Sequence, residues 1–302
     1  MFEGCGTALV TPFRANGSLD EATLRKLVRR QVEAGINFLV PCGTTGESPT
    51  LTRAEHLRVV EITLEEAHGV VPILAGAGGN NTAEVIQLVR ELSAMGVDGI
   101  LSVTPYYNKP TQEGLYQHYK AIAAAASLPI IVYSVQGRTG VNVEPATLKR
   151  LAAIDNIVGV KEASGNITQQ AAIIARLPER FAVLAGDDAI SLPLIAVGGR
   201  GLISVASNEI PAEMTRMVRL AMEGDFASAR ELYFRYLPLL ETNFCEPNPM
   251  PVKAAMAMMG LLEPVWRLPM VAPKPESIAK IEAVLRSLGL LRADLSSARA
   301  SD

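Results

Sequence analysis

The sequence alternates short, apolar, β-branched runs with longer segments of helical period, and this alternation limits how the chain can fold more than any other feature. Such runs are typical of parallel strands that are buried on both faces. Eight of them occur: Gly6–Val10, Asn37–Cys42, Val71–Ala75, Gly99–Val103, Ile130–Val135, Ile157–Val160, Phe181–Ala185 and Gly201–Val205. Eight strands alternating with helices predict an α/β fold, a (β/α)8 or TIM barrel.

Two helix starts carry capping-box patterns, Ser18 with Glu21 and Thr52 with Glu55. A doubly wound sheet is the alternative architecture. It is disfavoured because neither a G-x-G-x-x-G turn nor the acidic residue expected after it follows the first strand.

The pattern becomes all-helical after about Gly224, over Asp225–Phe244, Pro251–Leu262 and Pro275–Leu290. We therefore predict a barrel over residues 1–223 and a C-terminal helical domain over residues 224–302. The small, polar stretch Arg292–Asp302 is predicted to be a frayed tail.

Composition excludes several classes of function. A net charge of -3 lacks the basic footprint of nucleic-acid binding. The three histidines, His56, His68 and His118, have no zinc-like spacing, so we expect no metal. Three scattered cysteines, no signal peptide and no membrane span indicate a reduced cytoplasmic protein without a membrane partner. Cys42, just before a Gly-rich turn, is a candidate reactive thiol.

Active sites of such barrels form at the C-terminal ends of the strands. Lys161 is the only lysine that ends an apolar strand. Inside the barrel mouth its amine would be partly desolvated, and it could attack a carbonyl carbon. An ion pair with Glu162, Asp187 or Asp188 is the alternative role. Glu162 is a poor partner because neighbouring residues on a strand face opposite ways.

Three further features lie at the same strand ends. Tyr133 could pass protons to and from an imine, directly or through Thr44, or it could be a buried aromatic residue with a satisfied hydroxyl. The turn Gly43-Thr44-Thr45-Gly46 offers hydroxyls and N–H groups that suit a carboxylate. Arg138 offers a bidentate fork for a second carboxylate, or is a solvated loop residue.

The ordered motifs resemble the 4-hydroxy-tetrahydrodipicolinate synthases (formerly dihydrodipicolinate synthases) of the pyruvate-dependent class I aldolase superfamily. The resemblance covers roughly residues 1 to 290. It is carried by Thr11-Pro12-Phe13, Gly43–Ser48, Val103–Pro110, Gln112–Tyr119, Arg138-Thr139-Gly140, Gly159–Ala163, Gly186-Asp187-Asp188, Glu246–Pro249 and Pro251-Val252-Lys253.

The resemblance implies an enzyme that condenses pyruvate with L-aspartate 4-semialdehyde through a lysine Schiff base, without a cofactor. It implies that Lys161 forms the Schiff base and that Tyr133, Thr44 and Tyr107 relay protons, with Tyr107 supplied across a dimer interface. It also implies a homotetramer built as a dimer of dimers. The implied substrate-binding residues are Thr44 and Thr45 for the pyruvate carboxylate, Arg138 for the semialdehyde carboxylate, and Ile203 and Gly186 in the pocket.

The resemblance further suggests feedback inhibition by lysine at a dimer interface. The matching residues are Ser48, His56, Gly78, Asn80, Glu84 and Tyr106. Pro49 and Arg53 depart from the family pattern, and the positive charge of Arg53 should disfavour a cationic ligand. We therefore expect weak to moderate inhibition. Ser134-Val135-Gln136-Gly137 also departs from the pattern, because it lacks a proline before Arg138.

Three alternatives remain open at this point. A sister aldolase acting on a sugar acid would share Lys161, Tyr133 and the Gly-rich turn, but Tyr107 and Arg138 favour the synthase. Magnesium-assisted enolisation by Glu162, Asp187 and Asp188 is a poor match. A non-catalytic pyruvate-binding barrel would be expected to lose the relay tyrosines.

Overall fold

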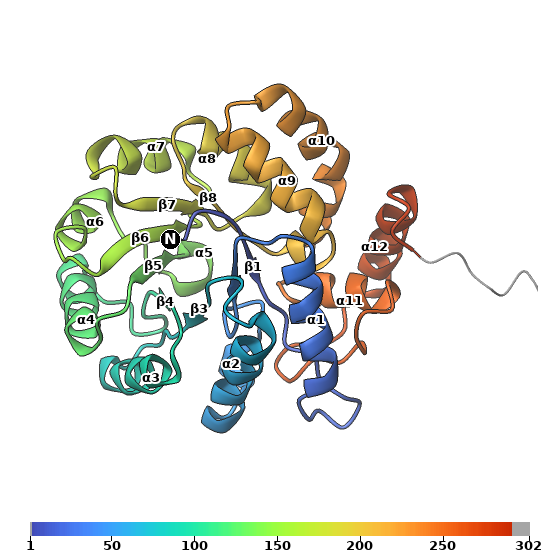
Figure 1. The fold of residues 1–302 in the computed structure, drawn as a ribbon, viewed down its shortest axis with the longest axis horizontal. Helices are drawn as coiled ribbons and strands as arrows, with labels where there is room; N and C mark the ends of the chain where they lie inside the picture. Colours follow the sequence, from blue (N-terminus) through green and yellow to red (C-terminus); the bar gives the residue numbers. More distant parts are fainter. Residues whose placement is uncertain (1, 292–302) are drawn as a thin grey trace, which may run out of the picture.

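A computed structural model describes residues 2–291, so the predicted tail Arg292–Asp302 lies outside the described residues. Eight parallel strands form one sheet in the order β2-β1-β8-β7-β6-β5-β4-β3. A parallel bridge between Leu39 and Ile73 links the two end strands, so the barrel is nearly closed. The strands surround the centre of the molecule and the helices cover them (Figure 1). The predicted TIM barrel is therefore confirmed.

The strands are short and lie close to the predicted positions. Their bounds are β1 (Gly4–Ala8), β2 (Phe38–Val40), β3 (Leu74–Gly76), β4 (Gly99–Val103), β5 (Ile130–Ser134), β6 (Ile157–Glu162), β7 (Ala182–Ala185) and β8 (Gly201–Ser204). β6 continues two residues beyond the predicted end at Val160, so Lys161 lies inside the strand rather than after it. Lys161 is in register with Tyr133 on β5 and Leu184 on β7.

Both faces of the sheet are buried, which explains why the strands read as continuous apolar runs. One set of side chains, including Phe38, Leu74, Tyr133 and Leu184, packs together inside the barrel. A larger set packs between the strands and the outer helices. Tyr133 therefore belongs to the interior of the barrel and not to its helix-facing side.

The helices alternate with the strands and then continue beyond them. Their bounds are α1 (Glu21–Glu33), α2 (Arg53–Ala67), α3 (Thr82–Met95), α4 (Gln112–Ala125), α5 (Gln136–Thr139), α6 (Pro145–Leu151), α7 (Ile167–Arg176), α8 (Ser191–Ala196), α9 (Pro211–Met222), α10 (Phe226–Thr242), α11 (Met250–Met258) and α12 (Pro275–Ser287). Short 3-10 turns cover Ser48–Thr50, Asp188–Ile190 and Ala206–Asn208. Figure 1 shows α12 beside α11, outside the ring of barrel helices.

One predicted capping box is confirmed and the other is wrong. At α2, the Thr52 hydroxyl accepts from the Glu55 N–H while the Glu55 carboxylate accepts from the Thr52 N–H. At α1 the cap is Asp20, whose side chain accepts from the N–H of Thr23. The predicted cap Ser18 instead donates its hydroxyl to the Asn16 side chain, 2.7 Å away, in the preceding turn.

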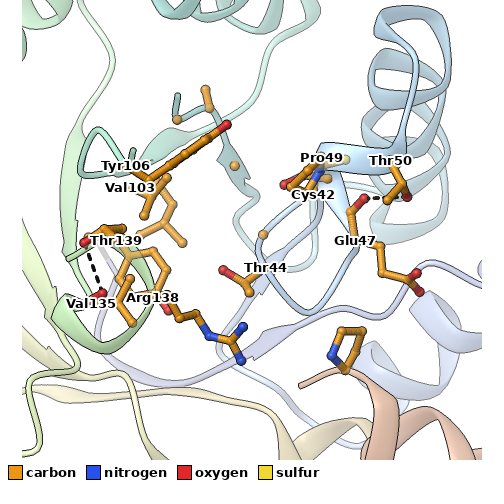
Figure 2. A pocket seen from close by; sticks show the side chains of 18 of the residues that line it. Cys42, Thr44, Glu47, Pro49, Thr50, Val103, Tyr106, Val135, Arg138 and Thr139 are labelled. Atoms are coloured by element: carbon orange, nitrogen blue, oxygen red, sulfur yellow. Dashed lines mark hydrogen bonds between the residues drawn. The ribbon is translucent and has the colours of Figure 1, made fainter. Parts of the chain in front are cut away.

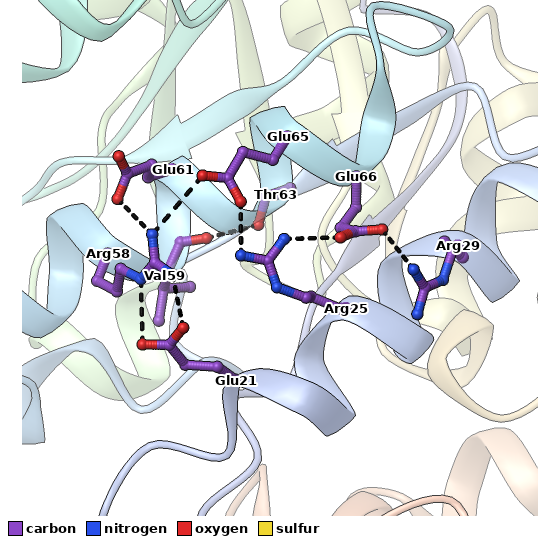
Figure 3. Close-up of polar contacts among 9 residues, drawn as sticks. All are labelled: Glu21, Arg25, Arg29, Arg58, Val59, Glu61, Thr63, Glu65 and Glu66. Carbon is purple, nitrogen blue, oxygen red and sulfur yellow. Dashed lines mark hydrogen bonds and ion pairs between the residues drawn. The ribbon is translucent and has the colours of Figure 1, made fainter.

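Helices α1 and α2 are joined by an ion-pair network (Figure 3). Arg58 on α2 binds Glu21 on α1 at 2.6 Å. Arg25 on α1 binds Glu65 and Glu66 on α2 at 2.6 and 2.7 Å. The network therefore joins two neighbouring outer helices of the barrel. Within residues 2–291, no helix is long and apolar enough to cross a membrane.

Candidate active site

A cavity of about 100 Å³ lies where the strands end, and most of the predicted catalytic and substrate-binding residues line it. Thr44 and Thr45 come from the turn after β2, Tyr133 from β5, Lys161 from β6 and Gly186 from the end of β7. The remaining wall is formed by Val135, Arg138, Ala163, Asp187, Val205, Phe244 and Asn248. Six separate segments thus line one space, and they bring hydroxyl, amine and guanidinium groups together.

Lys161 is the buried amine of this cavity, with 5% of its surface exposed. Its Nζ atom lies 4.3 Å from the centre of the Tyr133 ring. No ion pair within residues 2–291 includes Lys161, so no carboxylate holds its nitrogen. Gly186 leaves room for it, because a Cβ atom on Gly186 would lie 3.2 Å from Lys161 Cε. The amine is therefore left available to a substrate carbonyl.

The acidic neighbours of Lys161 point elsewhere. Glu162 accepts hydrogen bonds from Gln169 and Gln170 on the opposite side of β6, as strand alternation predicts. Asp188 is fully buried and accepts from Ser204 Oγ at 2.5 Å and from two backbone N–H groups after β8. Burial raises the pKa of the Asp188 carboxyl to about 6.

These contacts argue against two alternatives: an ion pair that holds Lys161, and magnesium-assisted enolisation. Neither Glu162 nor Asp188 forms an ion pair with Lys161, and Asp187 caps the turn that follows it by accepting from the Ala189 N–H at 2.9 Å. Among the described residues, no three His, Cys, Asp or Glu side chains converge as metal ligands. The three carboxylates that magnesium-assisted enolisation would need therefore do not share a site.

A second, larger cavity of about 460 Å³ adjoins the first and shares Thr44, Tyr133, Val135, Arg138 and Asn248 with it. Figure 2 shows the Arg138 side chain extending toward Thr44 across this space. Arg138 belongs to the short helix α5, and its Nη2 donates to the backbone oxygen of Asn248 at 3.3 Å. The guanidinium is therefore held at the passage between the two cavities.

The residues predicted for lysine binding divide into two groups. Ser48, His56, Gly78 and Tyr106 line the larger cavity. Asn80 and Glu84 do not line it and lie at the start of α3, where Glu84 accepts from the Asn81 side chain at 2.9 Å. Arg53 forms an ion pair with Glu91 at 3.1 Å, so its charge is partly neutralised within the chain.

The structure does not bring two other predicted residues to the cavities. Tyr107 is 89% exposed, lines neither cavity and has a positive φ of 71°. Ile203 is fully buried in the barrel interior beside Tyr133 and Leu184, below the cavity surface. Of the three predicted relay residues, Tyr133 and Thr44 therefore line the cavities within one chain and Tyr107 does not.

The sequence reasoning missed the groups that hold the Thr44–Thr45 turn. Asn248, 4% exposed, donates from its side-chain Nδ2 to Thr45 Oγ1 at 3.0 Å. Lys253 on α11 is fully buried and donates to Glu47 Oε1 at 2.6 Å and to the backbone oxygen of Thr11 at 3.1 Å. Both residues stand in motifs that carry the family resemblance. No strand-end rule points to them, because they follow the end of the last strand, β8, by more than 40 residues.

Cys42, a candidate reactive thiol in the sequence, is buried. It is 3% exposed, and its Sγ atom is 3.6 Å from the backbone oxygen of His56. Burial raises the pKa of the thiol far above its ordinary value, so the nucleophilic thiolate is not formed near neutral pH.

Replacing His56 with glutamine is expected to flatten the pH dependence of stability. His56 donates from Nε2 to the Gly76 oxygen at 2.9 Å, and burial lowers its pKa to about 4. Below pH ~6.5 the unfolded chain takes up a proton that the folded chain refuses, so stability is lost as the pH falls toward 4.

The effect on the free energy of unfolding reaches ~1.4 kcal/mol per pH unit in that window. His56→Gln keeps an N–H donor and removes this slope, which urea unfolding at several pH values would measure. Burial also lowers the pKa of His118 to about 4, but His118 is present in both proteins, so its contribution to the pH dependence cancels in the comparison. If the free energy of unfolding varied with pH in the same way for the two proteins, the prediction would be contradicted.

The profile of the Dihydrodipicolinate synthetase family matches residues 1–288. The chain is 56% identical over 290 residues to the 4-hydroxy-tetrahydrodipicolinate synthase of Koribacter versatilis, covering 96% of this chain and 97% of that protein. It is 52% identical over 291 residues to the protein of the same name from Nitratidesulfovibrio vulgaris, covering 96% and 99%.

Solved structures agree with the sequence relatives. The dihydrodipicolinate synthase from Aquifex aeolicus superposes with a TM-score of 0.94 at 43% identity, covering 97% of this chain and all (100%) of that chain. A structure described as the first monomeric dihydrodipicolinate synthase variant gives a TM-score of 0.94 at 44% identity, covering 96% and 98%.

Proposed function

Because the chain belongs to the dihydrodipicolinate synthetase family, we propose that its buried Lys161 forms the Schiff base with pyruvate. The chain is a Schiff-base-forming lyase that condenses pyruvate with L-aspartate 4-semialdehyde to give 4-hydroxy-tetrahydrodipicolinate. This reaction is the first committed step of lysine and diaminopimelate biosynthesis. The observation that carries the assignment of Lys161 is its amine, which is buried in the cavity beside Tyr133 and pairs with no carboxylate of residues 2–291.

The reaction begins when the Lys161 nitrogen attacks the keto carbon of pyruvate and water leaves. The imine loses a proton from the pyruvate methyl group and becomes an enamine. The enamine carbon then attacks the aldehyde carbon of the second substrate, which forms the new carbon–carbon bond. The amino group of that substrate closes the ring on the imine carbon and releases Lys161. The protein needs no cofactor in this scheme, because the lysine itself activates the substrate.

Two groups receive the two carboxylates. The hydroxyls of Thr44 and Thr45, on the wall of the smaller cavity, take the pyruvate carboxylate near Lys161. Arg138, at the passage to the larger cavity, takes the carboxylate of the semialdehyde through its bidentate fork. This arrangement places the aldehyde toward the enamine, and Gly186 keeps the space around Lys161 open.

The protons move through Tyr133 and Thr44, which line both cavities. The third relay residue, Tyr107, comes from a partner subunit, because its own ring is exposed and outside both cavities. The active unit is accordingly a dimer, and a pair of dimers forms the tetramer. The monomeric variant among the structural relatives makes the oligomeric state a point to measure, by light scattering alongside activity.

Reduction with borohydride in the presence of pyruvate tests the proposal. The imine is trapped as a stable N-carboxyethyl group on the lysine, which peptide mass spectrometry locates. We expect the adduct on the peptide that contains Lys161 and none on the peptide that contains Lys253, the other buried lysine of the barrel mouth. Lys161→Ala should remove the adduct. Folded wild-type protein without an adduct at Lys161 would overturn the proposal.

Comparison of second substrates separates the synthase from a sister aldolase. Aspartate semialdehyde should be consumed by the pyruvate-loaded enzyme, whereas keto-deoxy sugar acids and sialic acids should not be cleaved. Arg138 supports this expectation, because its fork at the passage suits a second carboxylate. Cleavage of a sugar acid at a comparable kcat/KM would favour the sister activity. A non-catalytic pyruvate-binding barrel would form the adduct and turn over neither.

Lysine acts as a weak to moderate feedback inhibitor in this proposal. Ser48, His56, Gly78 and Tyr106 line the larger cavity, which supports a ligand site there. The pairing of Arg53 with Glu91 reduces the repulsion that Arg53 would exert on a cationic ligand. Activity that stays flat up to millimolar lysine would remove this part of the proposal.

A further inference from the structure

We propose that Asn248 is a positioning residue that fixes the direction of the Thr45 hydroxyl, so that its proton is presented to the pyruvate carboxylate. Asn248 Nδ2 donates to Thr45 Oγ1 over 3.0 Å. Both side chains line the smaller cavity, and they are 4% and 2% exposed. The inference rests on the proposed function, since it assigns a task to a residue that holds the first substrate.

The Thr45 hydroxyl can both donate and accept hydrogen bonds. A threonine hydroxyl has one proton and two lone pairs, whereas a carboxylate only accepts. When an amide N–H occupies a lone pair of Thr45 Oγ1, the proton is left for another acceptor. Within the described part of the chain, the only hydrogen bond of this hydroxyl is the one from Asn248. Its proton is therefore unclaimed until a substrate arrives, and the site is organised in advance to bind an anion.

The position of Asn248 is itself fixed from several sides. Its backbone oxygen accepts from Arg138 Nη2 at 3.3 Å. It stands just before α11, where Lys253 reaches back to Glu47 and to Thr11. Glu47 in turn donates its N–H to the oxygen of Thr44 at 3.1 Å, which closes the turn that carries both threonines. These contacts hold the backbone of Asn248 beside the turn, whereas its buried side-chain Oδ1 accepts no hydrogen bond within residues 2–291 and its Nδ2 bonds to Thr45.

Asn248 touches both proposed carboxylate-binding groups, but through different atoms. Its side chain contacts Thr45, and its backbone contacts Arg138. A side-chain substitution should therefore alter pyruvate binding and leave the contact with Arg138 in place. This difference lets kinetic measurements distinguish a positioning role from a general loss of structure.

Asn248→Asp is the sharpest variant, because it keeps the shape of the side chain and removes the donor. A carboxylate can only accept, so the Thr45 proton turns toward it and away from pyruvate. We expect the pyruvate concentration for half-maximal borohydride trapping to rise at least ~10-fold, since a hydrogen bond to a charged group is lost and a like charge is added. The KM for aspartate semialdehyde at saturating pyruvate should change less than ~2-fold.

The pH dependence supplies a readout that a structural defect would not give. A protonated carboxyl group donates one hydrogen bond, so the new side chain regains the role of the amide at low pH. The pyruvate concentration for half-maximal trapping, taken as the ratio of variant to wild type, should therefore fall as the pH is lowered from about 7 toward about 5. The reason is that burial raises the pKa of a carboxyl group above its ordinary value of about 3.9. A ratio that is independent of pH would overturn the proposal.

A double-mutant cycle keeps the proposal testable if the charged variant folds poorly. Asn248→Ala should weaken pyruvate trapping ~3- to 10-fold in the wild-type background. In a Thr45→Val background the same change should have no further effect, because the hydroxyl it directs is gone. Equal effects in both backgrounds would overturn the proposal. Wild-type protein that forms no adduct would instead contradict the function of Lys161, which is a separate failure.

Discussion

Replacing Lys161 with methionine is expected to abolish turnover and to make the protein more stable. Without the amine no imine forms, so kcat should fall by at least ~10⁴-fold. Methionine fills a similar volume without a polar atom. Since Lys161 is 5% exposed and has no carboxylate partner in residues 2–291, the cost of burying its nitrogen is removed. The free energy of unfolding should rise by about 1–2 kcal/mol.

Urea unfolding and steady-state kinetics on the same preparations measure the two effects. Lys161→Arg is the matched control, because it removes the nucleophile and keeps a buried cation. It should lose activity to the same degree without the gain in stability. Lys161→Met with lowered stability would show that the nitrogen has a stabilising partner, and residual turnover well above the expected level would show that another group carries the chemistry.

Breaking the buried ion pair between Lys253 and Glu47 is expected to have the largest cost in stability. Their side chains are 0% and 1% exposed, and the charged atoms are 2.6 Å apart. Lys253→Met or Glu47→Gln alone leaves one charge buried without its partner, which typically costs 3–5 kcal/mol, about a third or more of the stability of an ordinary domain. Phe13 adds a cation–π contact, because the centre of its ring lies 4.5 Å from Lys253 Nζ.

The double variant should recover much of that loss, since neither charge remains. We expect a coupling energy of at least ~2 kcal/mol in a double-mutant cycle followed by urea unfolding. The exposed pair between Arg219 on α9 and Glu223, the residue that caps the end of α9, is the comparison; the two groups are 3.3 Å apart, and removing the pair should cost ~0.5 kcal/mol or less. Additive losses for Lys253 and Glu47 would show that the two charges do not depend on each other.

Much of the barrel could be predicted because its strands are buried on both faces. Each strand then appears as a run of apolar residues, and the run alone locates it within a few positions. The exact ends of the strands and helices could be predicted less well. The apolar run predicts a strand that stops at Val160, yet β6 includes the polar Lys161, because a cavity rather than the core receives its side chain. The predicted cap of α1 is wrong because the Ser18 hydroxyl donates to the Asn16 side chain, and Asp20 caps the helix instead.

The candidate site likewise contains residues that could be predicted from the sequence and residues that could not. Lys161, Tyr133 and Thr44 follow from the rule that barrel sites form at strand ends, and the structure places all three on one cavity. Asn248 and Lys253 depend on how α10 and α11 return to the barrel mouth, which no local pattern encodes. Tyr107 could not be placed by either route, because a single chain leaves it outside the cavity.

The contacts of Asn248 and Lys253 have a consequence for how the protein is made. Asn248 follows Ser204, the last residue of β8, by 44 residues. At a synthesis rate of ~5–20 residues per second, the barrel strands leave the ribosome ~2–9 s before the residues that hold the Thr44–Thr45 turn. A nascent chain therefore carries Lys161 and the Thr44–Thr45 turn before it carries Asn248 and Lys253, so the turn lacks the contacts that hold it until α11 has been synthesised.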